Sequence, residues 1–287
     1  MRNSQADVRS ADSAFRIPHS PLPPVLCYHR VGGPLELGVT RVSPRTFQRQ
    51  MSVLARAGWR TLTVAEYADR ITRPPSPVPR PALLLTFDDG YAVLARHAYP
   101  VLADLGLTAV TFLVTDYVGR TNTWDARYTW RRLPHLDWDT IAHWRARGFE
   151  FGSHGATHRR LTWADDAAVA HELARSRATL TARLGEDAGA AVAYPFGATE
   201  PRVGRLARAA GYRLGFAGVR GTVADPFDQP RVGVYLWDRF APPLGLRDGL
   251  PGAVGRAAAH VANRCSVGTS ALLALMRSRE PGAGSRT

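Results

Sequence analysis

Short apolar segments alternate with longer amphipathic segments along most of this 287-residue chain. The apolar runs are typical of strands in parallel sheets, which are buried on both faces. The amphipathic segments have helical spacing and stop at a glycine, as at Gly106, Gly148 and Gly185. Strands that alternate with helices predict parallel βαβ units. Six or seven such units without a Gly-x-Gly-x-x-Gly fingerprint favour a barrel over a doubly wound sheet.

The spacing also predicts where the elements lie. Strands are expected at 24–28, 82–87, 108–115, 149–153, 190–196, 213–219 and 231–237, and helices at 44–57, 91–105, 139–147, 163–184 and 201–210. These elements define an α/β chain of three parts. The parts are a flexible leader over 1–23, a barrel domain over 24–240, and a helical C-terminal extension and tail over 241–287.

The leader is polar and proline-rich, without the apolar core of a secretory signal. No apolar run approaches the roughly 18 residues of a membrane span. Both features favour a cytoplasmic protein without a transmembrane segment. Residues 270–279 are apolar and end in arginines, so two interpretations stay open for them: a helix packed on the barrel, or peripheral association with a membrane surface.

Arginine accounts for all 37 residues counted as Lys+Arg, and the formal net charge is +13. The lack of lysine excludes a Walker-type phosphate loop and Schiff-base catalysis, which both need a lysine. The arginines are scattered rather than clustered, so we expect no nucleic-acid partner. Cys27 and Cys265 match no metal-binding spacing and are interpreted as small buried side chains.

Polar residues recur where the expected strands end. His29 follows the first strand, Asp88-Asp89-Gly90 the second, and His154 with His158 the strand at 149–153. In barrels the working residues lie at the carboxyl ends of the strands, so these side chains are expected to share one site. Two histidines and one carboxylate suit a hydrolytic or redox metal. The alternatives are an ordinary Asp-Gly turn and, for the histidines, one capping and one surface residue.

Three segments carry a resemblance to a known family. They are Leu85-Thr86-Phe87-Asp88-Asp89-Gly90, Gly152-Ser153-His154-Gly155-Ala156-Thr157-His158 and Tyr194-Pro195-Phe196-Gly197. Together they resemble the polysaccharide deacetylases (NodB homology, carbohydrate esterase family 4), over about residues 24 to 237. The resemblance implies a distorted, TIM-like (β/α)7 barrel and a divalent metal, usually zinc.

The resemblance also implies roles for individual residues. It makes Asp89, His154 and His158 the metal ligands and Asp88 the general base. The backbone N–H of Phe196 is expected to form part of the oxyanion and substrate site, which Tyr194 and Pro195 help to build. These residue types suit amide hydrolysis, which needs an activated water, a polarised carbonyl and a proton for the departing amine.

Two features depart from the family pattern. Ala193 stands where an arginine usually orients the base, and no late Leu-x-His motif supplies the general acid. The segment Val25-Leu26-Cys27-Tyr28-His29 resembles the circularly permuted poly-N-acetylglucosamine deacetylase branch, in which the acid comes from the first strand. His29 is therefore expected to be the acid, protonated near its titration range. Arg231 either replaces the missing arginine or pairs with a surface acid.

The loop between the strands at 108–115 and 149–153 is rich in aromatic residues. Trp124 and Trp130 could stack on sugar rings, or pack beneath the barrel rim. The leading hypothesis is a metal-dependent deacetylase that releases acetate from N-acetylhexosamine glycans. The alternatives are deacylation of a small sugar conjugate, glycolipid or secondary metabolite, and a catalytically weak carbohydrate-binding barrel. Retention of Asp88 with Asp89 argues against the last, because a binding module needs no general base.

Overall fold

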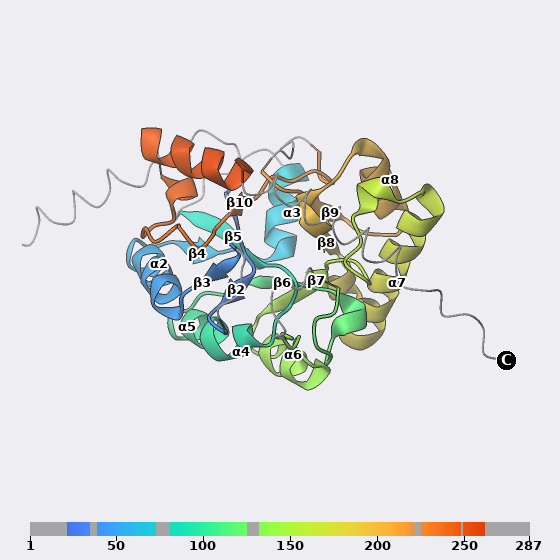
Figure 1. Ribbon diagram of the computed structural model, residues 1–287, viewed down its shortest axis with the longest axis horizontal. Coiled ribbons are helices and arrows are strands. Elements are labelled where there is room, and N and C mark those ends of the chain that lie inside the picture. The colour runs from blue at the N-terminus through green and yellow to red at the C-terminus, as the bar shows by residue number, and fades with distance from the viewer. Residues whose placement is uncertain are drawn as a thin grey trace, which may run out of the picture.

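A parallel sheet that curls on itself forms the centre of the molecule (Figure 1). The computed structural model describes residues 22–34, 39–72, 81–124, 132–219, 221, 225–247 and 249–261. Within these residues the strand order is β10-β1-β5-β6-β7-β8-β9, and β4 pairs with β5 off this path. The strands are β1 (Val25–Tyr28), β4 (Arg60–Thr61), β5 (Ala82–Phe87), β6 (Val110–Leu113), β7 (Glu150–Ser153), β8 (Ala191–Ala193), β9 (Leu214–Phe216) and β10 (Val232–Gly233). A separate pair joins β2 (Arg30–Val31) and β3 (Arg41–Val42).

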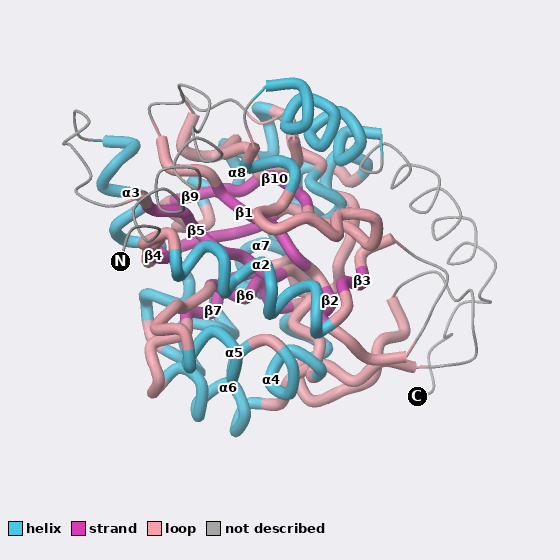
Figure 2. The backbone as a smooth tube through the Cα atoms, turned by 90° about the vertical axis from the view of Figure 1, so that its left-hand side faces the viewer, coloured by secondary structure: helices cyan, strands magenta, loops and turns pink. Residues whose placement is uncertain are grey.

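Helices cover the outside of this sheet (Figure 2). They are α2 (Pro44–Arg56), α3 (Val64–Thr72), α4 (Val93–His97), α5 (Tyr99–Asp104), α6 (Trp138–Arg145), α7 (Asp166–Leu184) and α8 (Pro201–Ala209). The exception is α3, whose Val64 and Tyr67 pack in the apolar cluster inside the sheet. The helix starts follow from the sequence: Ser43 caps α2, Asp137 caps α6 and Asp165 caps α7, each by accepting a bond from a backbone N–H three residues later.

Alternate strand residues divide into two apolar layers. Val25, Leu84 and Phe112 belong to the cluster that fills the inside of the sheet. Leu26 and Leu85 belong to the larger cluster beneath the helices. By the same alternation Cys27, Thr86 and Asp88 face inward, so polar side chains occupy the carboxyl end of the inner layer.

The barrel is closed by one segment that pairs with two strands in turn. Residues 226–229 run beside β9, with backbone bonds from Gly215 N to Pro226 O and from Gln229 N to Gly215 O, both 2.9 Å. The chain then enters β10, in which Val232 pairs with Leu26 of β1. Arg231 lies between these two contacts. Among the described residues the join between β9 and β10 therefore consists of this short parallel segment, so the ring of strands is irregular at that point.

The expected fold class is confirmed, with local differences. The helix expected at 91–105 is two helices, because Pro100 lacks the N–H that a continuous helix would use at that position. Neither β4 nor α3 was expected. The strand has two residues, too few for a periodic signal. The nine-residue helix was overlooked, although its buried Val64 and Tyr67 stand at helical spacing. Residues 249–261 are helical, as expected for part of the C-terminal extension.

The leader up to residue 21 and the tail from 262 lie outside the described residues, so the three-part division stays a prediction. No helix in the described part of the chain is long and apolar enough to cross a membrane. The segment 270–279, with its two interpretations, also lies outside the described residues.

Candidate active site

Three side chains at the carboxyl end of the barrel converge on one point. Asp89 follows β5, and His154 and His158 follow β7. The Nε2 atoms of both histidines lie 3.5 Å from Asp89 Oδ1, and one ligand atom from each of the three residues lies within 4.8 Å of the others. All three residues are at most 6% exposed. The structure therefore brings together the expected metal triad.

The chemistry of this donor set fits a divalent metal. His154 Nδ1 lies 2.7 Å from Ala193 O, an acceptor, so Nδ1 carries the proton. His154 Nε2 is then a lone-pair donor that faces Asp89. A carbonyl that fixes the tautomer of a ligating histidine in this way is the usual arrangement around zinc. Two imidazoles and one carboxylate, with positions left for water and substrate, form a set that zinc accepts.

Tight turns aim the ligands. Gly90 N donates to Asp88 O at 2.9 Å, which closes a turn with Asp89 at its centre. Asp89 has φ 70° and His158 has φ 58°, a left-handed backbone that costs a non-glycine residue on the order of 1–3 kcal/mol. Both interpretations of Asp88-Asp89-Gly90 are therefore correct. The segment is a turn, and the turn directs Asp88 towards Arg231 and Asp89 towards the two histidines.

Asp88 is buried and paired with Arg231. The guanidinium donates from Nη1 to Oδ1 at 2.7 Å and from Nη2 to Oδ2 at 2.8 Å, and both side chains are 4% exposed. Arg231 also donates from Nε to Ala217 O at 2.9 Å, which fixes its plane. Burial alone would raise the pKa of Asp88, but the Arg231 charge holds that pKa well below its usual range. Arg231 thus contacts Asp88 and not a surface acid.

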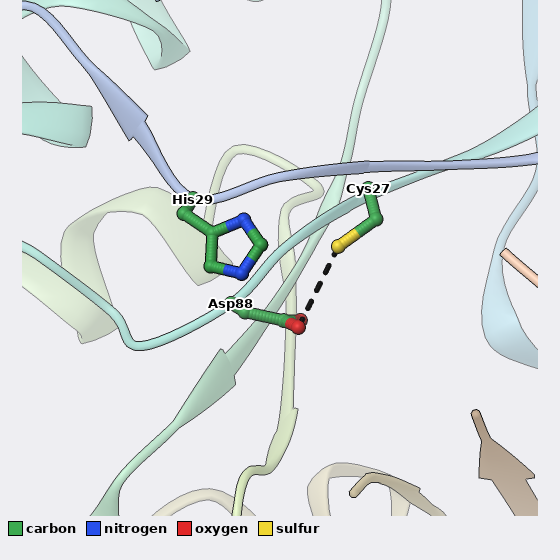
Figure 3. Close-up of side chains that lie close together, drawn as sticks. All are labelled: Cys27, His29 and Asp88. Carbon is green, nitrogen blue, oxygen red and sulfur yellow. Dashed lines mark hydrogen bonds between the residues drawn. The ribbon is translucent and has the colours of Figure 1, made fainter. Parts of the chain in front are cut away.

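Cys27 and His29 approach Asp88 from the first strand (Figure 3). The Cys27 thiol donates to Asp88 Oδ2 at 3.5 Å, and one ligand atom from each of Cys27, His29 and Asp88 lies within 4.8 Å of the others. Burial raises the pKa of Cys27 far above its usual range, so the thiol keeps its proton. The expectation for Cys27 as a small buried side chain agrees with its 5% exposure. Its contact with the carboxylate was not expected.

His29 differs in charge from the expectation. Burial lowers its pKa to about 4, with Arg231 and His154 acting in the same direction and Asp88 opposing them. The ring is therefore a neutral imidazole at pH 7 rather than an imidazolium near its titration range. Any proton that His29 donates must first reach it during the reaction.

The third motif follows β8. Pro195 lies next to Gly155, where its ring carbon Cγ would be 3.7 Å from a Cβ atom placed on the glycine. The Phe196 ring centroid lies 4.7 Å from that of His158. Tyr194 is fully buried and donates its hydroxyl to Phe227 O at 3.0 Å. Its side chain therefore supports the segment from behind and cannot contact a substrate, which corrects one expectation.

Two roles were left open for Trp124, and the structure favours packing beneath the barrel rim over stacking on a sugar. The side chain is 4% exposed, and its ring lies on His158 with the centroids 3.7 Å apart. A ring covered in this way offers no open face to a sugar. Trp130 lies outside the described residues.

Buried Glu172 of α7 was missed at the sequence level. It accepts from the backbone N–H of Thr157 at 2.6 Å and from the Thr157 hydroxyl at 2.9 Å. These bonds hold the loop between His154 and His158. A glutamate in the middle of an amphipathic helix gives no local signal of such a role.

Comparisons with known proteins agree with this geometry. Residues 76–215 match the family model for polysaccharide deacetylase. The Bacillus subtilis (strain 168) protein YxkH, which bears a polysaccharide deacetylase name, is 27% identical over 192 residues. That alignment covers 67% of this chain and 63% of the relative, so the match spans less than two thirds of the length of the relative.

Solved structures share the fold. IcaB from Ammonifex degensii superimposes with a TM-score of 0.60 and 28% identity, covering 84% of this chain and 96% of that one. The Streptococcus pyogenes deacetylase PplD, solved in complex with acetate, has a TM-score of 0.67 and 20% identity, covering 77% of this chain and 94% of that one. The family match over residues 76–215 and the three motifs at one end of the barrel therefore identify this part of the chain as similar to the polysaccharide deacetylases, of the NodB-homology type, and the solved structures share its fold.

Proposed function

We propose that this protein is a metal-dependent hydrolase that removes N-acetyl groups from N-acetylhexosamine-containing glycans. One observation carries the proposal. A carboxylate held by an arginine, Asp88, lies beside a separate cluster of one carboxylate and two imidazoles. Amide hydrolysis needs this division of labour, because the residue that takes the proton must not be occupied by the metal.

The residues would act as follows. Asp89, His154 and His158 would hold a divalent ion, with zinc as our first choice, and when bound it would polarise the amide carbonyl and acidify a water. Asp88 accepts the proton of that water, and Arg231 fixes the carboxylate plane through its two bonds. The N–H of Phe196 donates to the developing oxyanion.

The proton then has to reach the departing nitrogen. His29 is neutral at rest and lies beside Asp88, so it can take up the proton that Asp88 has removed and pass it to the amine. The C–N bond breaks, and the products are acetate and a free amino sugar. The water gives its oxygen to acetate and both of its protons to nitrogen, one through His29 and one from the acetic acid first formed, so the amino sugar leaves as an ammonium group and the balance needs no further reactant.

Acetate release over a substrate panel tests the proposal. The panel runs from N-acetylglucosamine through its oligomers to the polymer, together with a small N-acetylated sugar conjugate, and it separates glycan from conjugate as the substrate. Asp88→Asn should retain the metal and lose roughly 10²–10⁴ in rate, the usual contribution of a general base. A parent protein that binds the panel sugars but releases no acetate would instead indicate a carbohydrate-binding barrel.

A further inference from the structure

Trp124 and His135 lie together behind the metal-ligand cluster, and the proposed chemistry uses neither. Both are buried, with exposures of 4% and 5%. His135 belongs to a segment that docks directly on the turn after Asp89. Leu136 N donates to Gly90 O at 2.8 Å, and Ala92 N donates to Pro134 O at 2.9 Å.

A chain of hydrogen bonds runs from Trp124 to Asp89 in one direction. The indole Nε1 of Trp124 can only donate, and it lies 3.3 Å from Nε2 of His135. Nε2 must therefore be the acceptor, which places the imidazole proton on Nδ1. That N–H donates to the backbone carbonyl of Asp89 at 2.8 Å. Each group in the chain has one role that fits its chemistry.

The other end of the pair contacts a second ligand. The Trp124 ring lies on the His158 ring with a centroid distance of 3.7 Å and an interplanar angle of 33°. The Tyr91 ring stacks on His135 at 5.1 Å, which fixes the imidazole plane. One hydrogen-bonded pair therefore holds Asp89 by its backbone and His158 by its ring face.

Asp89 and His158 are also the two ligands with a left-handed backbone, at φ 70° and 58°. A residue in this conformation persists only when its surroundings hold it there. We propose that Trp124 and His135 form a clamp, a pair of positioning residues that keeps Asp89 and His158 in metal-binding geometry before the ion arrives. The proposal rests on the proposed function to the extent that the cluster binds a metal.

The alternative is ordinary packing of a loop on the barrel. In that case substitutions would weaken the fold without a specific effect on the metal. Two measurements distinguish the cases. Loss of a clamp lowers the affinity of the folded protein for Zn²⁺, whereas loss of ordinary packing lowers only the stability of the metal-free protein to urea.

The test uses three variants of the full chain. His135→Leu removes both bonds, and His135→Asn can keep the bond to Asp89, because an asparagine amide reaches the position of Nδ1. Trp124→Phe keeps a ring on His158 but removes the indole N–H. The controls are His143→Leu, at an exposed histidine of α6, and Trp163→Phe, at a tryptophan that is 52% exposed.

Zn²⁺ affinity is measured by competition with a chelator, and the Co²⁺ absorption spectrum reports the coordination geometry. We expect His135→Leu to bind Zn²⁺ roughly 10–100-fold more weakly, the usual effect of losing a partner behind a ligand. His135→Asn should recover most of this loss, and both controls should match the parent. Adding Trp124→Phe to His135→Leu should cost little more, since the indole N–H no longer has its acceptor.

Unchanged Zn²⁺ affinity and Co²⁺ spectrum in His135→Leu would overturn the clamp, as would equal losses in the Leu and Asn variants. Failure of the proposed function looks different. The parent would then bind Zn²⁺ no better than His154→Ala, or would bind it with clamp-dependent affinity and release no acetate.

Discussion

Variants of the Asp88–Arg231 pair can separate two contributions of the Asp88 carboxylate, one to the free energy of unfolding and one to the rate of acetate release. Asp88→Asn leaves a buried guanidinium without its counterion, and Arg231→Met leaves a buried carboxylate without its own. Both side chains are 4% exposed and joined at 2.7 and 2.8 Å, so each single change should lower the free energy of unfolding by about 3–5 kcal/mol.

The double variant removes both charges at once. It loses in addition only the bond from Arg231 to Ala217 O, worth about 1 kcal/mol. We therefore expect the double variant to be more stable than either single one, with a coupling free energy of at least about 2 kcal/mol. All three variants should still lose roughly 10²–10⁴ in the rate of acetate release, because none of them retains an oriented base.

Urea unfolding of the metal-free proteins at pH 7 measures these differences. The matched control is Arg175→Met, which breaks a pair of similar length, 2.9 Å, to Asp116, but with Arg175 half exposed. That change should cost no more than about 1 kcal/mol. If the two single losses simply add in the double variant, the pair is not an energetic unit and the reasoning from burial is wrong.

Three further predictions concern groups around the site. His29→Ala should keep the Zn²⁺ content and lose roughly 10²–10⁴ in rate, measured by metal analysis and acetate release; an unchanged rate removes His29 from the proton path. Burial lowers the pKa of His29 and His135 to about 4, so the metal-free protein should lose stability as the pH falls from about 6.5 towards 4, by about 1.4 kcal/mol per pH unit for each group. His135→Leu should flatten this slope, as urea midpoints at several pH values would show, and an unaltered slope contradicts the assignment. In a Cys265→Ser variant, Cys27 should react with a thiol reagent only on unfolding, because it is 5% exposed and its pKa is raised; rapid labelling of the folded protein would contradict this.

Local patterns account for the parts of this site that the sequence predicts. Asp88 and Asp89 follow directly on the apolar strand β5, His154 follows directly on β7, and His158 lies in the loop after it. The carboxyl ends of parallel strands meet by geometry. The fold class could be predicted for the same reason, since alternation of strands and helices leaves few topologies open.

The remaining features depend on contacts between distant segments. Asp88, the partner of Arg231, lies 143 positions away along the chain. Sequence patterns report local neighbours, so they could not decide whether Arg231 pairs with Asp88 or with a surface acid. Trp124 is of a residue type that often stacks on sugar rings, but in the structure its ring packs on His158. The charge of His29 depends on burial, which strand position alone does not give.

The order of the strands also has a consequence for synthesis of the protein. The triad and Asp88 are complete once residue 158 has been made, whereas the counterion of Asp88 arrives only with the segment that closes the barrel. A nascent chain that ends before residue 231 would contain every proposed metal ligand and the base, yet the carboxylate would have no guanidinium to orient it. The proposed ligands and the base are thus synthesised well before the arginine that orients the base, so Asp88 cannot be oriented until the chain has been made as far as residue 231.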